Sequence, residues 1–405
     1  PLPMGRFQLR IQRACRTPLL DTYFAAWSIF AEEEFYLIAI PALMWNVDYV
    51  FARHLNYVTC TGLLVGNTLK DVFRLPRPST KRGVWRGGSA EYTDSTSMRD
   101  FGYPSTHAMN ALSNTLLALL YCYCVPVGTP GALDLGAYAV GGFTLMPDCN
   151  GFPLFAGLLI CVVWFFSITF GRLYLGAHSP TDVRGGIILG VAIGLFWWYL
   201  GDHYDALTLH VPHLGASVLA LAWVIIMLSP QPRPMTPTFL QNCLLVGLQA
   251  GCTLGFRTEF ERRAAATATA AVSQEDMYSF RSHGLRIVIG YVLVLVARQA
   301  NKTLLTALLR AAFGIDPSPV GKLKLKVDNP TKDKDEESDD EGDDDPWGQH
   351  VPLDKYVPRV LEGWDLCGAA MVKFCGYMMV AWLITSGCPQ LFEAFGLGTD
   401  LRLKV

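Results

Sequence analysis

Long apolar stretches without charge are the feature that most constrains how this chain can fold. A helix needs about 20 mostly apolar residues to cross a bilayer. Ala108–Val125 and Phe152–Phe170 run for 18 and 19 residues without a charged side chain. Only 17% of the 405 residues are charged, whereas soluble domains carry about 25%. The sequence therefore predicts an all-α, polytopic transmembrane helical bundle.

We expect eight or nine spans in this bundle. The remaining apolar segments are Leu55–Leu69, Gly185–Leu200, Leu214–Ser229, Phe239–Phe256, Ile287–Ala297 and Leu366–Cys388. Three glutamates interrupt the segment Tyr23–Asn46. This leaves three alternatives for that segment: one long span, a span with an interfacial helix, or two short elements.

Charge and cysteine content exclude several classes of protein. The net charge of −2 gives no global field for nucleic acid. The eleven cysteines match no zinc or disulfide spacing. Ten acidic residues lie between Asp333 and Asp345. Such a run repels itself and has no core to bury, so we expect disorder there.

The first of three polar motifs is Lys70–Pro78, directly after an apolar segment. An arginine such as Arg77 binds two phosphate oxygens through its planar fork, while Lys70 supplies a compact charge. Basic residues at a helix end also anchor it among lipid headgroups. Taken alone, this motif predicts either an anchor or an anion site.

The second motif is Pro104–His107, directly before Ala108–Val125. Ser105 or Thr106 can cap that helix, and a helix start favours a bound anion. His107 would then lie in the first turn, where it can donate a proton to a leaving oxygen. A plain cap with a surface histidine is the alternative.

The third motif runs from Arg172 to Asp182. Ser179 and Asp182 have the spacing of a helix capping box. The i, i+4 spacing also allows Asp182 to accept the N–H of His178, which would fix the tautomer of the ring. Arg172 supplies a second guanidinium for a phosphate.

The three motifs fall on one membrane face if each neighbouring segment crosses once. Lys70 follows one segment, His107 precedes the next, and Arg172 follows the third. The loop Pro126–Gly151 then lies on the other face. This agreement predicts one shared site.

The pattern resembles the type 2 phosphatidic acid phosphatase superfamily, whose signature is K-x6-R-P, P-S-x-H and S-R-x5-H-x3-D. The three motifs match at the correct spacings, except that Gly171 stands where the pattern usually has serine. Thr106 and the strings around the motifs are similar to the sphingoid base phosphate phosphatase branch. The resemblance is strong over Phe35–Leu200 and weak beyond it.

This resemblance implies a six-helix phosphatase core and a phosphohistidine mechanism. His178 would attack phosphorus, Asp182 would orient it, and His107 would protonate the departing lipid oxygen. The implied phosphate-binding residues are Lys70, Arg77, Ser105, Thr106 and Arg172. Because these cations and the helix-start N–H groups can replace a metal, we expect no metal and no other cofactor.

The resemblance further implies that the preferred substrate is sphingosine-1-phosphate or a related long-chain base phosphate. A phosphatidic or lysophosphatidic acid phosphatase is the alternative within the same class. A non-catalytic lipid-phosphate transporter and a headgroup transferase are alternatives from other classes. The expected partners are the lipid substrate and membrane lipids, without nucleic acid; the oligomeric state stays open.

The expected organisation has five parts. They are a basic cytosolic arm (1–20), a catalytic core (21–200), further transmembrane helices (201–310), an acidic disordered loop (311–363), and a C-terminal transmembrane helix with a tail (364–405). The positive-inside rule places the arginine-rich arm in the cytosol. The span count then places the catalytic loops on the lumenal face of the endoplasmic reticulum membrane. This requires an odd number of spans before Lys70.

Overall fold

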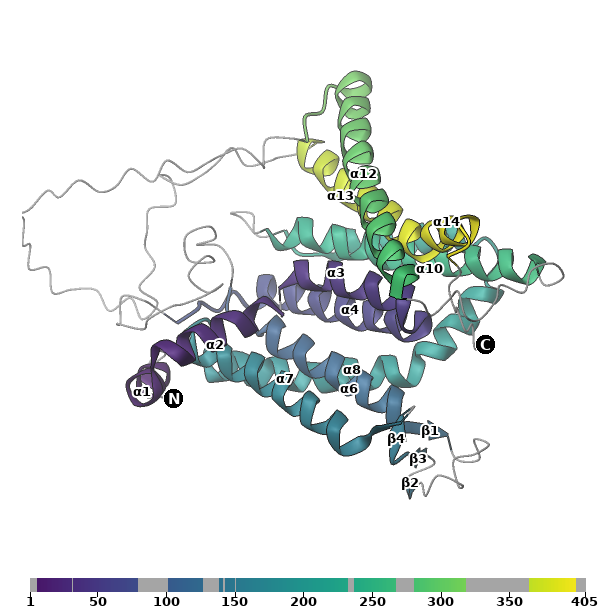
Figure 1. Cartoon of the computed structure of the whole chain (residues 1–405). Coiled ribbons are helices and arrows are strands. Elements are labelled where there is room, and N and C mark those ends of the chain that lie inside the picture. Colours follow the sequence, from purple (N-terminus) through teal and green to yellow (C-terminus); the bar gives the residue numbers. More distant parts are fainter. Residues whose placement is uncertain are drawn as a thin grey trace, which may run out of the picture.

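The computed structural model is a bundle of helices with two small β-sheets at one end (Figure 1). It describes residues 6–30, 32–78, 101–126, 138–140, 143–149, 151–231, 237–266, 280–317 and 364–397. The predicted acidic run lies outside these residues. The helices are α1 (Arg6–Cys15), α2 (Pro18–Ile29), α3 (Glu33–Asn46), α4 (Tyr49–Phe73), α6 (Thr106–Tyr123), α7 (Leu154–Tyr174), α8 (Pro180–His210), α9 (Leu214–Leu228), α10 (Thr238–Ala266), α12 (Phe280–Phe313), α13 (Trp364–Trp382), the π-helical η5 (Leu383–Gly387) and α14 (Cys388–Ala394).

The helical fold class is confirmed, and five helices of the described part are long and apolar enough to cross a membrane. They are α7, α8, α10, α12 and the continuous rod Trp364–Ala394. The predicted number of eight or nine spans is not confirmed. On α7 and α12, large apolar side chains point outward, among them Phe155, Ile160, Val288 and Val292. Soluble proteins rarely expose so much apolar surface, so these faces fit a lipid environment.

The segment Tyr23–Asn46 forms two separate helices, so the interpretation as one long span is wrong. α2 has 12 residues and ends at Ile29; α3 begins at Glu33. α2 is about 18 Å long, which is too short to cross a bilayer. It packs along α7, where Tyr23 hydrogen-bonds Ser167 at 2.6 Å.

The helix predicted over Leu55–Leu69 begins earlier, at Tyr49, and is 25 residues long. Its added first turns contain Arg53 and His54, both buried. Arg53 forms a bidentate ion pair with Asp205 of α8, and His54 Nε2 lies 2.8 Å from the same carboxylate. Because paired charges can be buried, α4 continues through residues that sequence hydropathy excludes.

The loop predicted over Pro126–Gly151 contains short strands that were not anticipated. β1 (Cys124–Pro126) and β2 (Tyr138–Val140) both pair antiparallel with β3 (Phe143–Leu145), and β4 (Asp148–Cys149) pairs with β5 (Phe152–Pro153). Figure 1 shows these strands at the opposite end of α7 from α1. The placement of this loop away from the three motifs is therefore confirmed.

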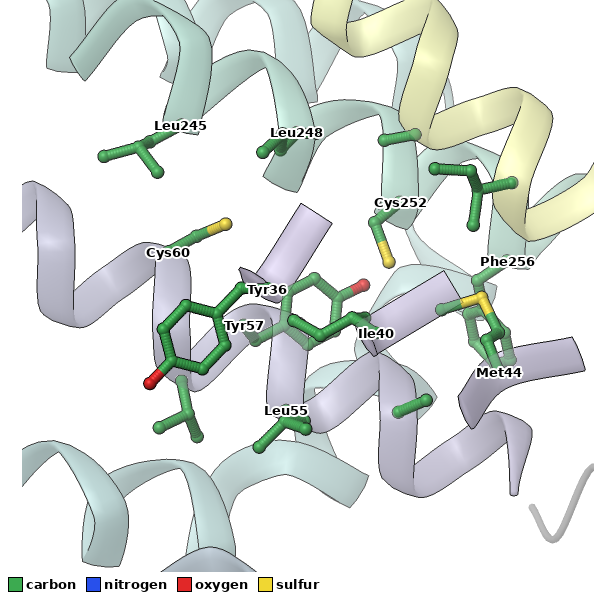
Figure 2. Close-up of a cluster of buried hydrophobic side chains, with 14 of the residues drawn as sticks. Tyr36, Ile40, Met44, Leu55, Tyr57, Cys60, Leu245, Leu248, Cys252 and Phe256 are labelled. Carbon is green, nitrogen blue, oxygen red and sulfur yellow. The ribbon is translucent and has the colours of Figure 1, made fainter. Parts of the chain in front are cut away.

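The main apolar core lies between α3, α4, α10 and the α13–α14 rod. Figure 2 shows Tyr36, Ile40 and Met44 of α3 in the same cluster as side chains of α4 and α10. Trp45 of α3 donates its indole N–H to the Ile384 carbonyl at 2.9 Å. The helices beyond residue 200 thus complete the core around α3 and α4.

A row of glycines brings α8 against α6. A Cβ atom at Gly186 would lie 2.4 Å from the Ser105 carbonyl oxygen, and one at Gly190 would lie 2.7 Å from that of Met109. Small residues spaced four apart let two helix backbones touch in this way. The contact places the first turn of α6 next to the first turn of α8.

Replacing Gly190 by alanine tests this contact. The new methyl group would overlap the Met109 backbone, so the helices must separate, and we expect the free energy of unfolding to fall by about 1–3 kcal/mol. Thermal unfolding in detergent measures the change. Gly376→Ala is the matched control, because a Cβ there meets nothing within 4 Å. A Gly190→Ala protein as stable as this control would contradict the role of the glycine row.

Candidate active site

His178 lies in the loop between α7 and α8, and its side chain is fully buried. Its Nδ1 lies 2.9 Å from the carbonyl oxygen of Gly102. A carbonyl oxygen only accepts, so Nδ1 carries the hydrogen of the neutral ring. Nε2 keeps its lone pair and lies 3.4 Å from Nη1 of Arg77. The backbone of residue 102 thus fixes the tautomer in which Nε2 is the nucleophilic atom.

Asp182 is the carboxylate of a complete capping box at the start of α8. Its Oδ2 accepts from the Ser179 amide at 2.7 Å, and Ser179 Oγ accepts from the Asp182 amide at 3.3 Å. The same Oδ2 lies 3.7 Å from His178 Nδ1, too far for a hydrogen bond. The Gly102 carbonyl therefore replaces Asp182 as the acceptor expected for the ring. The carboxylate remains near enough to stabilise a positive charge on it.

The first motif reaches the His178 loop through two further bonds. Arg77 Nη1 donates to the Ala177 carbonyl at 3.2 Å, and the Gly102 amide donates to the Leu75 carbonyl at 2.7 Å. A Cβ atom at Gly102 would lie 3.1 Å from Asp182 Oδ2. Residue 102 must therefore be small, because its backbone lies close to both the first and the third motif.

Lys70 and Arg172 place two more cations around the ring. Lys70 is in the last turn of α4 and 5% exposed; Arg172 is in the last turn of α7 and 1% exposed. Burial, followed by the charges of Arg77, Arg172 and Lys70, holds the pKa of the His178 imidazole well below its usual range. A neutral imidazole among several cations is an arrangement that favours a bound anion.

Ser105 joins the second motif to the third. It is the N-cap of α6, where its Oγ accepts from the Ala108 amide at 3.4 Å. Its own amide donates to the Asp182 carbonyl at 3.0 Å. The methyl group of Thr106 points toward Gly66 of α4, so this side chain contributes to helix packing. Contacts of Ser105 and Thr106 with a phosphate remain predictions.

His107 lies in the first turn of α6, as expected, beside a carboxylate that the sequence did not single out. Its Nε2 lies 3.6 Å from Oε1 of Glu32, the residue before α3. Among the described residues, this nitrogen has no hydrogen-bond partner. In the sequence, Glu32 belongs to the run of three glutamates that interrupts the apolar segment. From the sequence alone, we interpret this run only as a break between helices.

The predicted placement of the N-terminal arm opposite the catalytic loops is wrong. Gln8 of α1 donates to the His178 carbonyl at 2.9 Å, and Gln12 donates to the Tyr174 carbonyl at 2.8 Å. Figure 1 shows α1 at the end of α7 that leads into this loop. The span count failed because α2 does not cross, so α3 and α4 return the chain to the face from which it started.

Gly171, the one departure from the signature, lies under an aromatic ring. A Cβ there would lie 3.2 Å from Cδ1 of Phe24 in α2. Phe24 also stacks near Tyr174, with ring centroids 4.8 Å apart. The space beside residue 171 is thus filled by packing of α2.

One group of side chains in the described residues has metal-ligand character. His54, Asp202 and Asp205 bring one donor atom each within 4.8 Å of one another. Asp205 already binds Arg53 and His54. His54 precedes Lys70 by 16 residues of one helix, which separates the group from the catalytic motifs by about 24 Å. We interpret it as the ion pair that joins α4 to α8.

Known proteins share this pattern. The family model described as the PAP2 superfamily matches residues 51–204. A Dictyostelium discoideum protein named "Probable sphingosine-1-phosphate phosphatase" is 28% identical over 301 residues, which cover 71% of this chain and 68% of the relative. "Lipid phosphate phosphatase delta" of Arabidopsis thaliana is 25% identical over 398 residues, 96% of this chain and 86% of the relative.

A further relative is "Sphingosine-1-phosphate phosphatase 2" of Mus musculus, 25% identical over 314 residues, which cover 74% of this chain and 78% of the relative. No solved structure matches the chain significantly. The family match contains all three motifs, and the structure brings these motifs together around the His178 loop. Residues 51–204 are therefore similar to the PAP2 superfamily in sequence and carry its three motifs.

Proposed function

We propose that this chain is a membrane phosphatase that hydrolyses the phosphomonoester of a sphingoid base phosphate, either sphingosine-1-phosphate or a related long-chain base phosphate. The observation that carries the proposal is the His178 ring, with Nδ1 bound to the Gly102 carbonyl and Nε2 facing Arg77. Two of the relatives described above are named as a probable sphingosine-1-phosphate phosphatase and as sphingosine-1-phosphate phosphatase 2, which supports the substrate class.

In the first half of the reaction, Nε2 of His178 attacks phosphorus and the bond from phosphorus to the lipid oxygen breaks. His107 gives its proton to that oxygen, so the lipid leaves as a neutral alcohol. Asp182 stabilises the positive charge that develops on the ring. Lys70, Arg77 and Arg172 stabilise the charge on the phosphoryl oxygens.

In the second half, His107 accepts a proton from water as the water attacks the phosphohistidine. The bond between nitrogen and phosphorus breaks, and inorganic phosphate leaves. The cations and the N–H groups at the start of α6 supply the charge that a metal would otherwise supply. We therefore expect activity without a metal ion.

A phosphatidic or lysophosphatidic acid phosphatase remains the second candidate. The Arabidopsis relative is named for lipid phosphates in general, which favours this broader class. A transporter that retains the phosphate site without turnover would not need His107, His178 and Asp182 together, and this chain has all three.

Purified protein in detergent with a chelator should release phosphate from sphingosine-1-phosphate faster than from phosphatidic or lysophosphatidic acid. His178→Ala should abolish this release, because it removes the nitrogen that forms the proposed covalent intermediate. Phosphate release measures both results. Wild-type protein inactive on all three lipids, or active only after a metal is added, would contradict the proposal; so would a fully active His178→Ala protein.

Asp182→Asn and Ser179→Ala separate the two roles of the third motif. The amide side chain of the Asp182→Asn variant would keep an oxygen for the Ser179 amide and lose the charge beside the ring, so kcat should fall at least tenfold while stability changes little. Ser179→Ala removes one bond of the cap and should cost about 1 kcal/mol of stability with a smaller effect on kcat. Thermal unfolding and steady-state kinetics measure both. Equal kcat values for the two variants would assign Asp182 to capping alone.

We also propose that the protein resides in the endoplasmic reticulum membrane with its catalytic loops on the lumenal face, as the resemblance to the sphingoid base phosphate phosphatase branch implies. The positive-inside rule does not support this orientation, because the basic helix α1 lies beside the His178 loop. Cys15, which is exposed on α1, then lies on the same face. A membrane-impermeant maleimide should label Cys15 in microsomes only after detergent opens them, with Cys15→Ser as the control for other thiols. Labelling of Cys15 in sealed vesicles would place the catalytic end in the cytosol.

A further inference from the structure

The Glu32 carboxylate lies beside the group that serves the departing lipid. Its Oε1 is 3.6 Å from Nε2 of His107, and the two side chains are 33% and 17% exposed. The Glu32 side chain is partly accessible, whereas the Nε2 atom of His107 is buried. None of the three motifs includes Glu32, and it precedes His107 by 75 residues.

The position of Glu32 relates it to particular atoms of a substrate. His107 contacts the oxygen that joins phosphorus to the lipid, so a carboxylate next to His107 lies next to the first carbons of the lipid. In a sphingoid base phosphate, the second of these carbons carries an ammonium group. In phosphatidic or lysophosphatidic acid, the same carbon carries an ester or hydroxyl oxygen. A carboxylate binds the former through a charge-assisted hydrogen bond and gains little from the latter.

The rest of the site makes such a carboxylate necessary for a cationic lipid. Lys70, Arg77 and Arg172 surround the position of the phosphate and repel an ammonium group. A cation brought into a partly buried site needs an opposite charge within reach. Glu32 supplies that charge beside His107.

An apolar groove between α3, α4, α6 and α7 includes Phe35, which follows Glu32 by three residues. The groove has a volume of about 230 Å³, and Phe35 of α3 and Trp164 of α7 line it. Asn114, Thr115 and Ala118 line it from α6. These positions lie two to three turns beyond His107 on one helix face. A hydrocarbon chain attached beyond the ammonium carbon therefore has an apolar surface to follow.

We propose that Glu32 binds the ammonium group of the sphingoid base phosphate and thereby sets the preference for this lipid over glycerol-based lipid phosphates. This inference rests on the proposed phosphatase function. A competing role for Glu32 is to orient His107, which would affect every lipid phosphate alike because His107 protonates the oxygen that they all share.

The test compares Glu32→Gln with wild type on sphingosine-1-phosphate and lysophosphatidic acid. With the carboxylate charge removed, we expect kcat/KM for sphingosine-1-phosphate to fall about tenfold or more, the size of one charge-assisted hydrogen bond. The value for lysophosphatidic acid should change less than threefold. Ceramide 1-phosphate, whose nitrogen is acylated and uncharged, should behave like lysophosphatidic acid.

Two variants serve as controls. Glu34→Gln removes the same charge from an exposed side chain in the first turn of α3 and should leave both activities unchanged. Glu32→Asp keeps the charge and should retain part of the preference for sphingosine-1-phosphate that Glu32→Gln loses. The activity on lysophosphatidic acid reports whether each variant is folded.

The outcomes separate this inference from the phosphatase proposal. A wild-type protein without activity on any lipid phosphate overturns the proposed function itself. An active wild type whose Glu32→Gln variant loses both activities equally, or loses neither, overturns the role of Glu32 as the ammonium-binding residue and leaves the phosphatase activity standing.

Discussion

The close backbone contact between α6 and α8 is the constraint on which the rest of the site depends. Gly186 and Gly190 let the two helices meet without intervening side chains. The N-terminal turns of both helices then lie side by side, and the Ser105 amide bonds the Asp182 carbonyl. Without this approach, His107 on α6 and His178 before α8, the proposed proton donor and nucleophile, would not lie in one site. A packing rule for membrane helices therefore also determines where the chemistry occurs.

Backbone groups hold much of the site together. Only the part that depends on side chains could therefore be predicted from the sequence. The three motifs were found because charged and capping side chains have recognisable spacings. Gly102 was missed because its contribution is a carbonyl oxygen, and every residue has one. Glu32 was missed because 75 residues separate it from His107, and only the fold reveals their proximity. The helical class followed from hydropathy alone.

Helix boundaries and topology were predicted less well, for reasons that are also physical. α4 is longer than its apolar stretch because Arg53 and Asp205 neutralise each other inside the protein. The placement of the arm failed because α2 is apolar enough to resemble a span and too short to be one. Hydropathy reports the preference of a segment for an apolar environment, and α2 satisfies that preference by packing on α7.

The contact between α1 and the His178 loop has a thermodynamic consequence. Gln8 and Gln12 bind two carbonyl groups of this loop and its preceding turn. If α1 left its place, both buried acceptors would need other donors, so docking of the arm and order of the loop form one coupled equilibrium. Linkage is reciprocal. An anion that orders the loop must tighten the arm by the same free energy, and whatever loosens the arm at the membrane surface must weaken the hold on that anion equally.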